Sequence, residues 1–381
     1  MRNHTTRADD GQTIRLAAMV DGESIHCVIG ILLTPGGSMS MRAFTSGAIL
    51  TLFGAVMSAQ PAVAQLRPSI DPAIQPYAKA VGISGSMIVA GSESMKSLSH
   101  RWEGKLRELY PGLTIKVEGI GSETGPPALL EGKAQIAAMS RQMTRQEIDL
   151  FAKRYGYEPT EVPVAADALA VFVHRDNPIS GMTLDELDAL FCKEHRRGLN
   201  EDRFSWSQFG LDADWSQAAI TLLGRNHASG SATFFREHVC GNGSFKESVK
   251  KEPGAASVVV DIKQDRYAIG YSGLGYRTSF VRAVPIATAK GKPYIEPTFD
   301  TTIDGSYPLR RLLYLYVNKA PKSAMPQVVT EFVKFAVSQE GQHAVVQEGF
   351  FPLPTAELNR LFAAWSTPMQ AAANHDAAAR D

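Results

Sequence analysis

Hydrophobic and polar residues follow two alternating periods along the first half of the chain. Short β-branched or alternating runs at 86–91, 113–119 and 134–140 predict strands. The segments between them, 97–110 and 126–132, carry apolar residues at helical spacing. This order of strand, helix, strand, helix and strand predicts an α/β fold built on a mostly parallel sheet.

The same alternation continues through the second half. Further strands are predicted at 168–178, 219–225, 267–276 and 310–319, and helices at 183–191, 231–239 and 325–349. Between 192 and 215 the pattern gives way to polar residues, which predicts an exposed insertion with Trp206 and Trp215 packed beneath it. A chain of 381 residues is long enough for two such α/β domains.

The segment 41–64 has a different pattern, which is typical of a signal peptide. Arg42 is followed by an apolar stretch and then by Ala62-Val63-Ala64, a small-residue cleavage site. We therefore expect export to the periplasm, with 1–40 an extension that precedes the true start. The alternative is a genuine extension followed by a buried helix.

Two segments flank the predicted domains. Residues 65–84 are rich in Pro and Ala and are expected to form a spacer, and the Ala-rich residues 366–381 are expected to form a flexible tail. Lys plus Arg and Asp plus Glu each number 39, so no broad basic field favours nucleic acid as a partner.

Cysteine usage is compatible with an oxidising compartment. Beyond the signal peptide the chain holds Cys192 and Cys240, which either form a disulfide or remain buried thiols. Neither has the spacing of a metal site, and we expect no metal and no cofactor.

Three junctions between predicted strands and helices are rich in Gly and Ser, namely 91–95, 121–127 and 228–235. In an open α/β sheet, ligands bind outside the carboxyl ends of the strands. There the first N–H groups of each helix are unpaired, Gly allows a ligand close to the backbone, and Ser donates a hydrogen bond. Together the three junctions predict a site for a small tetrahedral anion, although each alone is equally compatible with an ordinary helix cap.

Two arginines strengthen this prediction. Arg225 and Arg141 each follow a predicted strand, and a guanidinium can donate two parallel hydrogen bonds to an oxyanion. The alternative for either residue is a surface charge beside a carboxylate.

At these motifs the chain resembles the periplasmic phosphate-binding proteins of phosphate ABC transporters. The resemblance covers roughly residues 85–362 and rests on "GSESM", "EGIGSETG", "QIAAMSRQMT", "GRNHASGSATFF" and "AIGYSGLGY". The most specific motif is R-x-x-x-S-G-[ST]. The resemblance implies that phosphate is held by the following residues: Ser94, Met95, Ser122, Ser140, Arg141, Arg225, Ser229, Gly230 and Ser231.

The resemblance also implies a fold and a role. The fold is the two-lobed type II periplasmic binding protein fold, with lobe one formed by 85–167 plus 283–365 and lobe two by 168–282. Two crossing strands would join the lobes, one in "VFVHR" and one in the segment after "GLGY". The implied role is capture of inorganic phosphate by a monomer and delivery to an ABC permease, without catalysis.

One departure from the family leaves the bound anion open. Some members have an Asp in the third loop that accepts the proton of hydrogen phosphate, whereas this chain has Ser140-Arg141. Glu93 or Glu123 could take over as proton acceptor, or both could be solvated loop carboxylates. Sulfate, molybdate or a phosphonate is therefore an alternative cargo. A secreted phosphatase on the same scaffold is a further alternative, although the sequence contains no metal cluster or activated nucleophile.

Overall fold

The computed structural model describes residues 70–216, 218–321 and 323–366, together with the backbone of three strands near the N-terminus. These are β1 (Asn3–Arg7), β2 (Thr13–Asp21) and β3 (Ser24–Cys27), which form an antiparallel sheet of their own. Residues 1–64 and 65–381 are separate compact units, and the rest of this description concerns the second. The predicted signal peptide and residues 367–381 of the predicted tail lie outside the described residues.

One continuous sheet runs through the second unit. Its strands lie in the order β10 (Lys250–Glu252), β9 (Thr221–Arg225), β11 (Ala268–Gly273), β7 (Thr160–His174), β14 (Arg310–Val317), β6 (Ile136–Met139), β4 (Gly85–Gly91) and β5 (Leu113–Gly119). Strands β4, β5 and β6 are mutually parallel, as are β9, β10 and β11. The prediction of a mostly parallel sheet is correct within each group but wrong for β7 and β14, which are antiparallel to their neighbours.

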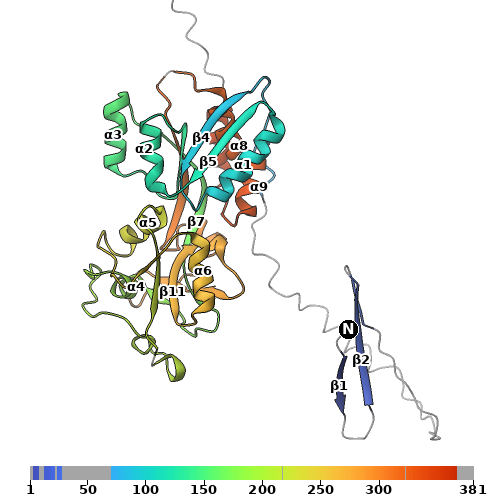
Figure 1. Ribbon diagram of the computed structural model, residues 1–381, viewed down its shortest axis with the longest axis vertical. Helices are drawn as coiled ribbons and strands as arrows, with labels where there is room; N and C mark the ends of the chain where they lie inside the picture. Colours follow the sequence, from blue (N-terminus) through green and yellow to red (C-terminus); the bar gives the residue numbers. More distant parts are fainter. Residues whose placement is uncertain are drawn as a thin grey trace, which may run out of the picture. The chain divides into compact units, whose positions relative to one another are not determined.

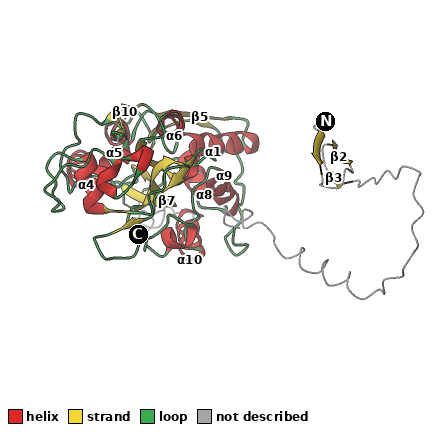
Figure 2. Ribbon diagram, turned by 90° about the horizontal axis from the view of Figure 1, so that it is seen from below, coloured by secondary structure: helices red, strands yellow, loops and turns green. Residues whose placement is uncertain are grey.

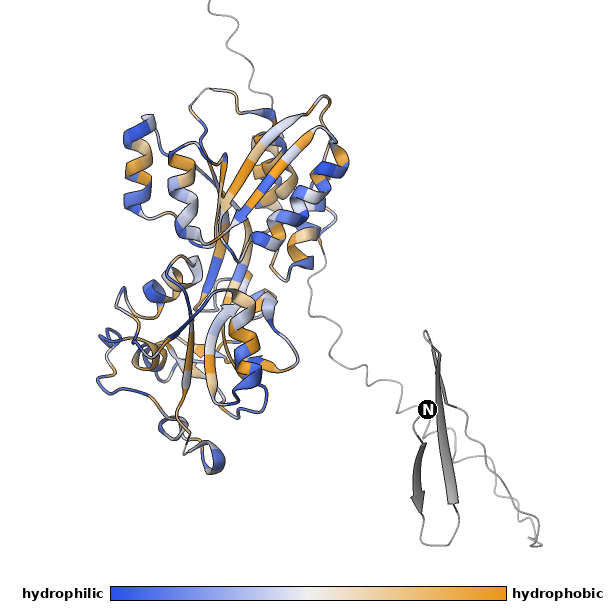
Figure 3. Cartoon of the chain, viewed as in Figure 1, coloured by the Kyte–Doolittle hydropathy of each residue, from blue (hydrophilic) through white to orange (hydrophobic). Residues whose placement is uncertain are grey.

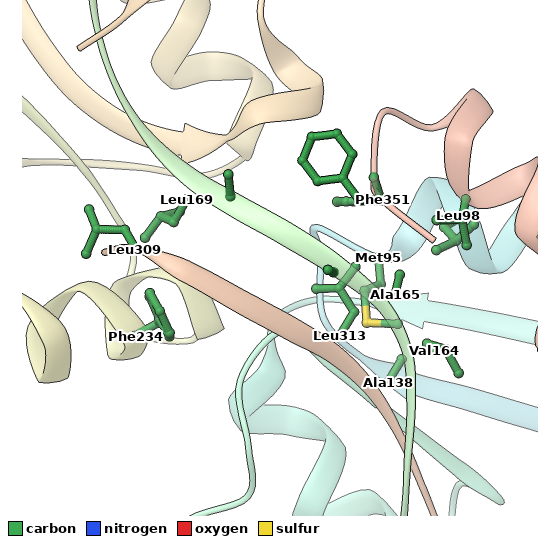
Figure 4. Close-up of a cluster of buried hydrophobic side chains, with 14 of the residues drawn as sticks. Met95, Leu98, Ala138, Val164, Ala165, Leu169, Phe234, Leu309, Leu313 and Phe351 are labelled. Atoms are coloured by element: carbon green, nitrogen blue, oxygen red, sulfur yellow. The ribbon is translucent and has the colours of Figure 1, made fainter. Parts of the chain in front are cut away.

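The long strand β7 joins two lobes (Figure 1). Its first part pairs with β14 from 160 to 168, and its second part pairs with β11 from 169 to 173. All residues from Val164 to Val173 are buried, so the strand lies in the core along this stretch. Figure 4 shows the packing around it: Leu169, Leu309 and Phe234 lie toward one lobe, and Met95 and Leu313 toward the other.

The return crossing differs from the prediction. Strand β12 (Val281–Ala283) pairs with the far end of β7, and β13 (Ile286–Ala287) pairs with β8 (Met182–Thr183). The segment after "GLGY" therefore continues lobe two, because its backbone completes the hydrogen bonding of strands there. The second crossing strand is β14, so the expected start of this part of lobe one at 283 is too early.

Helices cover the sheet in both lobes (Figures 1 and 2). The first lobe carries α1 (Lys96–Leu109), α2 (Gly125–Leu130), α3 (Arg145–Tyr155), α8 (Gln327–Ala336), α9 (Gln339–Gln347) and α10 (Thr355–Ser366). The second carries α4 (Leu184–Phe191), α5 (Gly230–His238) and α6 (Ala255–Gln264), and a short α7 (Phe299–Ile303) precedes β14. Helices of both lobes combine hydrophobic and hydrophilic positions (Figure 3), as expected when one face packs on a sheet. In the part of the chain that the structure describes, no helix is long and apolar enough to cross a membrane.

Two predicted helices can be compared directly with the structure. Helix α4 begins after Thr183, close to the predicted start at 183, and Thr183 forms a capping box with Glu186. The single helix predicted over 325–349 is instead two, because Ser338 caps a new helix by accepting a hydrogen bond from the N–H of Gly341.

The described part of the predicted spacer is packed rather than extended. Ile74 and Ile83 are buried, and the main-chain N–H of Gln339 donates to the carbonyl of Gln75 at 2.9 Å. The hydroxyl of Tyr77 also bonds with Glu331 of α8. Residues 70–84 are therefore part of the first lobe, because their apolar side chains are buried against its helices.

The insertion at 192–215 is anchored to the second lobe. Trp206 is fully buried beneath it, donates from Nε1 to the carbonyl of Tyr267 at 3.0 Å, and packs edge-to-face on Trp215. The two cysteines, whose state the sequence left open, are joined as the disulfide Cys192–Cys240. This bond connects the start of the insertion to the end of α5.

Candidate functional site

Loops from both lobes bring four serine hydroxyls together at the carboxyl ends of the strands. The Oγ atoms of Ser94 and Ser231 lie 3.5 Å apart, and those of Ser122 and Ser140 lie 3.2 Å apart. The main-chain N–H of Ser140 also donates to Ser122 Oγ at 3.1 Å. All four residues are buried. The structure therefore brings together in one hydroxyl cluster the hydroxyls from the three Gly- and Ser-rich junctions and the hydroxyl of Ser140, which only the family resemblance indicated.

Two glycines allow the lobes to approach this closely. A Cβ atom on Gly230 would lie 2.3 Å from Ser122 Oγ and 2.6 Å from Ser140 Oγ. A Cβ atom on Gly121 would lie 2.1 Å from the carbonyl oxygen of Ala228, on the opposite lobe. Such distances are far below van der Waals contact, so side chains here would hold the lobes apart.

Arg225 supplies the charge that this cluster needs for an anion. It ends β9, is 3% exposed, and donates from Nη2 to Glu93 at 2.8 Å. Its Nε and Nη1 are buried and have no hydrogen-bond partner among the residues that the structure describes. Buried guanidinium N–H groups without partners are costly, and an oxyanion is the partner that they fit best.

Helix starts add main-chain donors. Ser229 caps α5 and accepts a hydrogen bond from the N–H of Ser231 at 3.2 Å, so the positive end of this helix faces the hydroxyl cluster. Met95 precedes α1, but its side chain is fully buried beside Leu98 (Figure 4). Any contact between Met95 and an anion would therefore come from its main chain.

Arg141 has a different environment from the one predicted. Its guanidinium donates to both carboxylate oxygens of Glu147, at 2.7 and 2.8 Å, to Glu123 at 3.1 Å, and to the carbonyl of Gln142 at 2.7 Å. Burial opposes the charge of Arg141, but Glu147 and Glu123 outweigh it and raise the pKa of Arg141 above its usual value. In this geometry the donors of Arg141 are already engaged, so its contact with the anion stays a prediction.

The two candidate proton acceptors are also paired. Glu93 accepts hydrogen bonds from Arg225 and from the N–H of Ala255, which begins α6. Glu123 accepts from Arg141 and, across the cleft, from the hydroxyl of Thr233 at 2.8 Å. Both carboxylates therefore connect the two lobes beside the hydroxyl cluster.

One charged pair in the site was not predicted from the sequence. Arg311 on β14 donates from Nε and Nη2 to Asp167 on β7, at 2.9 and 2.7 Å, and both residues are buried. From Nη1 it reaches Ser231 Oγ at 2.8 Å and the carbonyl of Ser140 at 3.3 Å. Burial raises the pKa of Asp167 although Arg311 opposes this effect. The only signal for the pair was a charged residue in each of two predicted strands: Asp167 among apolar residues, and Arg311 beside Arg310 at the start of an apolar run.

One cluster of potential metal ligands lies away from the site. Asp188, Cys192 and Cys240 bring ligand atoms within 4.8 Å of one another. The two sulfur atoms are joined in the disulfide, so neither is a thiolate that could bind a metal.

The structure has two α/β lobes joined by crossing strands, with a buried polar cluster between the lobes. This arrangement defines the class of two-lobed binding proteins. The PBP superfamily domain model matches residues 76–340, and the chain belongs to this superfamily. Within it, the chain is 42% identical over 307 residues to the phosphate-binding protein PstS of Pseudomonas aeruginosa, covering 81% of this chain and 94% of that protein. It is 28% identical to the phosphate-binding protein PstS of Staphylococcus haemolyticus, covering 67% and 77%.

Solved structures agree on the fold. An ABC-type phosphate transport receptor from Vibrio cholerae superposes with a TM-score of 0.56 at 21% identity, covering 70% of this chain and all of that one. A phosphate-binding protein from Stenotrophomonas maltophilia gives 0.55 at 13% identity, covering 74% and 94%. The predicted two-lobed type II periplasmic binding protein fold is thereby confirmed.

Proposed function

We propose that this chain is a periplasmic solute-binding protein that captures inorganic phosphate between its lobes and delivers it to an ABC permease. The observation that carries the proposal is Arg225, whose buried Nε and Nη1 lack partners beside the serine hydroxyls. An oxyanion would satisfy these donors and the first N–H groups of α5 together. Relatives named for phosphate binding support the same ligand.

Binding without catalysis is part of the proposal. The hydroxyls at the site are hydrogen-bonded to one another or to Arg311, and the nearby carboxylates are bonded to arginines. A nucleophilic serine would need a neighbouring base to take its proton, and these contacts suit a ligand cage better. The protein acts as a monomer, after export through the predicted signal peptide.

A second cargo, sulfate, is favoured by one observation. The carboxylates of Glu93 and Glu123 each already accept a hydrogen bond from an arginine, which uses part of their capacity to accept the proton of hydrogen phosphate. Position 140 is a serine, which can donate equally to phosphate and to sulfate. Selectivity between these anions is therefore the property to measure.

The test is calorimetric titration of the protein from Gln65 onward, stripped of bound anion by unfolding and refolding. Phosphate, sulfate and molybdate are injected separately at pH 6 and pH 8. We expect tight phosphate binding that is lost in Arg225→Gln. Sulfate binding of equal strength would assign a broader oxyanion cargo, and no phosphate binding would refute the proposal. Turnover of an aryl phosphate that disappears in Arg225→Gln would instead favour the phosphatase.

A further inference from the structure

Asp167 and Arg311 form a buried ion pair on the two strands that cross between the lobes. They are direct partners in the register of β7 and β14. Arg311 directs Nε and Nη2 to the same carboxylate oxygen, Asp167 Oδ2, and the guanidinium lies 5.9 Å from the ring centre of Phe234. A single buried charge at this position would be strongly destabilising, so the two residues depend on each other.

The remaining nitrogen of Arg311 reaches both lobes. Its Nη1 donates to Ser231 Oγ, at the start of α5 in lobe two, and to the carbonyl oxygen of Ser140 in lobe one. No other side chain in the described site bonds to both of these loops from a crossing strand. Because Asp167 fixes two of the guanidinium nitrogens, the third is held in one direction.

This contact determines what the hydroxyl of Ser231 can do. A serine hydroxyl has one proton to donate and lone pairs that accept. When Arg311 donates to Ser231 Oγ, the proton of Ser231 remains for another acceptor. In the hydroxyl cluster, the groups near Ser231 Oγ are the hydroxyl of Ser94, at 3.5 Å, and any ligand that occupies the site.

We propose that Arg311, fixed by Asp167, is a positioning residue for the anion site: it makes Ser231 a hydrogen-bond donor toward the anion and ties the Ser231 and Ser140 loops to the crossing strand. The inference rests on the proposed function, because it assigns a role toward the same ligand. Arg311 acts through Ser231, whereas Arg225 contacts the anion itself.

The test is a double-mutant cycle on phosphate affinity, measured by calorimetry. A neutral pair, Asp167→Asn with Arg311→Gln, removes both buried charges together and is expected to weaken phosphate binding about tenfold. Arg311→Lys keeps a donor and a charge and should recover part of that loss. Arg310→Gln, a half-buried neighbour on the same strand, is the matched control and should bind as the wild type does.

The decisive step adds Ser231→Ala to the neutral pair and to Arg311→Lys. If Arg311 acts through Ser231, Ser231→Ala costs clearly less affinity in these backgrounds than in the wild type. The same combinations made with Ser122→Ala, whose hydroxyl bonds to Ser140 and to neither Arg311 nor Ser231, should be closer to additive. Losses from Ser231→Ala that are fully additive would overturn the inference, because a purely structural role gives no coupling to one hydroxyl.

Folding and function can be separated in the same experiment. Thermal unfolding identifies variants that are not folded, and if the neutral pair is among them, the cycle with Arg311→Lys decides the question. Wild-type protein that binds no phosphate would refute both the proposed function and this inference. Wild-type protein that binds, beside variants at Asp167 and Arg311 whose affinity losses are fully additive with that of Ser231→Ala, would refute this inference alone.

Discussion

Arg225 and Arg141 follow strands in opposite lobes, and each is 3% exposed, yet their surroundings differ in one decisive respect. The guanidinium of Arg141 donates to Glu123, Glu147 and a carbonyl. That of Arg225 bonds to Glu93 through Nη2 and leaves Nε and Nη1 without partners among the described residues. The two arginines therefore share burial and charge and differ in whether donors remain for a ligand.

The largest expected effect is a difference in phosphate affinity between variants of these two arginines. Arg225→Gln should weaken phosphate affinity about a thousandfold, because two charge-assisted hydrogen bonds and a buried positive charge are lost. Arg141→Gln, the matched control, should change the affinity by less than about threefold, because its donors are engaged by carboxylates. Calorimetric titration of both variants checks this. An Arg141→Gln variant that loses as much affinity as Arg225→Gln would break the comparison.

In contrast to ligand binding, the stability of the protein should depend strongly on Arg141. Arg141→Gln leaves the half-buried carboxylate of Glu147 without its main partner, and we expect the free energy of unfolding to fall by about 3 kcal/mol. Urea unfolding at pH 7 measures it. Arg145→Gln removes an exposed ion pair on α3 and should cost no more than about 0.5 kcal/mol. Equal losses in the two variants would show that Arg141 is not a structural ion-pair partner.

The sequence could not distinguish the two arginines for a physical reason. The helix that supplies Glu147, α3, was not predicted; Phe151 is its only buried residue, so few apolar positions mark it in "RQEIDLFAKRY". Because α3 was not predicted, Glu147 could not be recognised as the partner of Arg141. Most strands and the helices beside the Gly- and Ser-rich loops were predicted well, because their periodicity is local.

Arg311 and Asp167 escaped prediction for a related reason. Asp167 lies among apolar residues of β7 and Arg311 follows Arg310 at the start of β14, and nothing local indicates that Asp167 and Arg311 face each other. Their pairing depends on the register of two strands separated by more than a hundred residues of sequence. The return crossing was misplaced for the same reason, since strand pairing between distant segments decides where β14 joins the sheet.

A smaller effect tests whether the Arg225 side of the site depends on contact between the lobes. Gly230→Ala should weaken phosphate binding about thirtyfold, because the added Cβ would meet the hydroxyls of Ser122 and Ser140. Gly104→Ala in α1 is the matched control, since nothing lies within 4 Å of a Cβ there. Small-angle scattering should show less closure on phosphate addition in Gly230→Ala. Unchanged affinity in that variant would mean that the hydroxyls move aside easily.

The smallest expected effect concerns the acid response of the Arg141 side. Burial raises the pKa of Glu147, but the hydrogen bonds and charge of Arg141 outweigh it and hold that pKa below its usual value. A carboxylate with a lowered pKa stabilises the folded state above its unfolded pKa, and that stabilisation is lost as the pH falls through the folded pKa. Glu147→Gln should therefore lose less stability than the wild type as the pH falls from 7 to 3. Asp149→Asn, an exposed neighbour on α3, should follow the wild-type profile. Urea unfolding at each pH measures these differences. Identical profiles for Glu147→Gln and the wild type would show that the ion pair of Arg141 and Glu147 does not stabilise the fold.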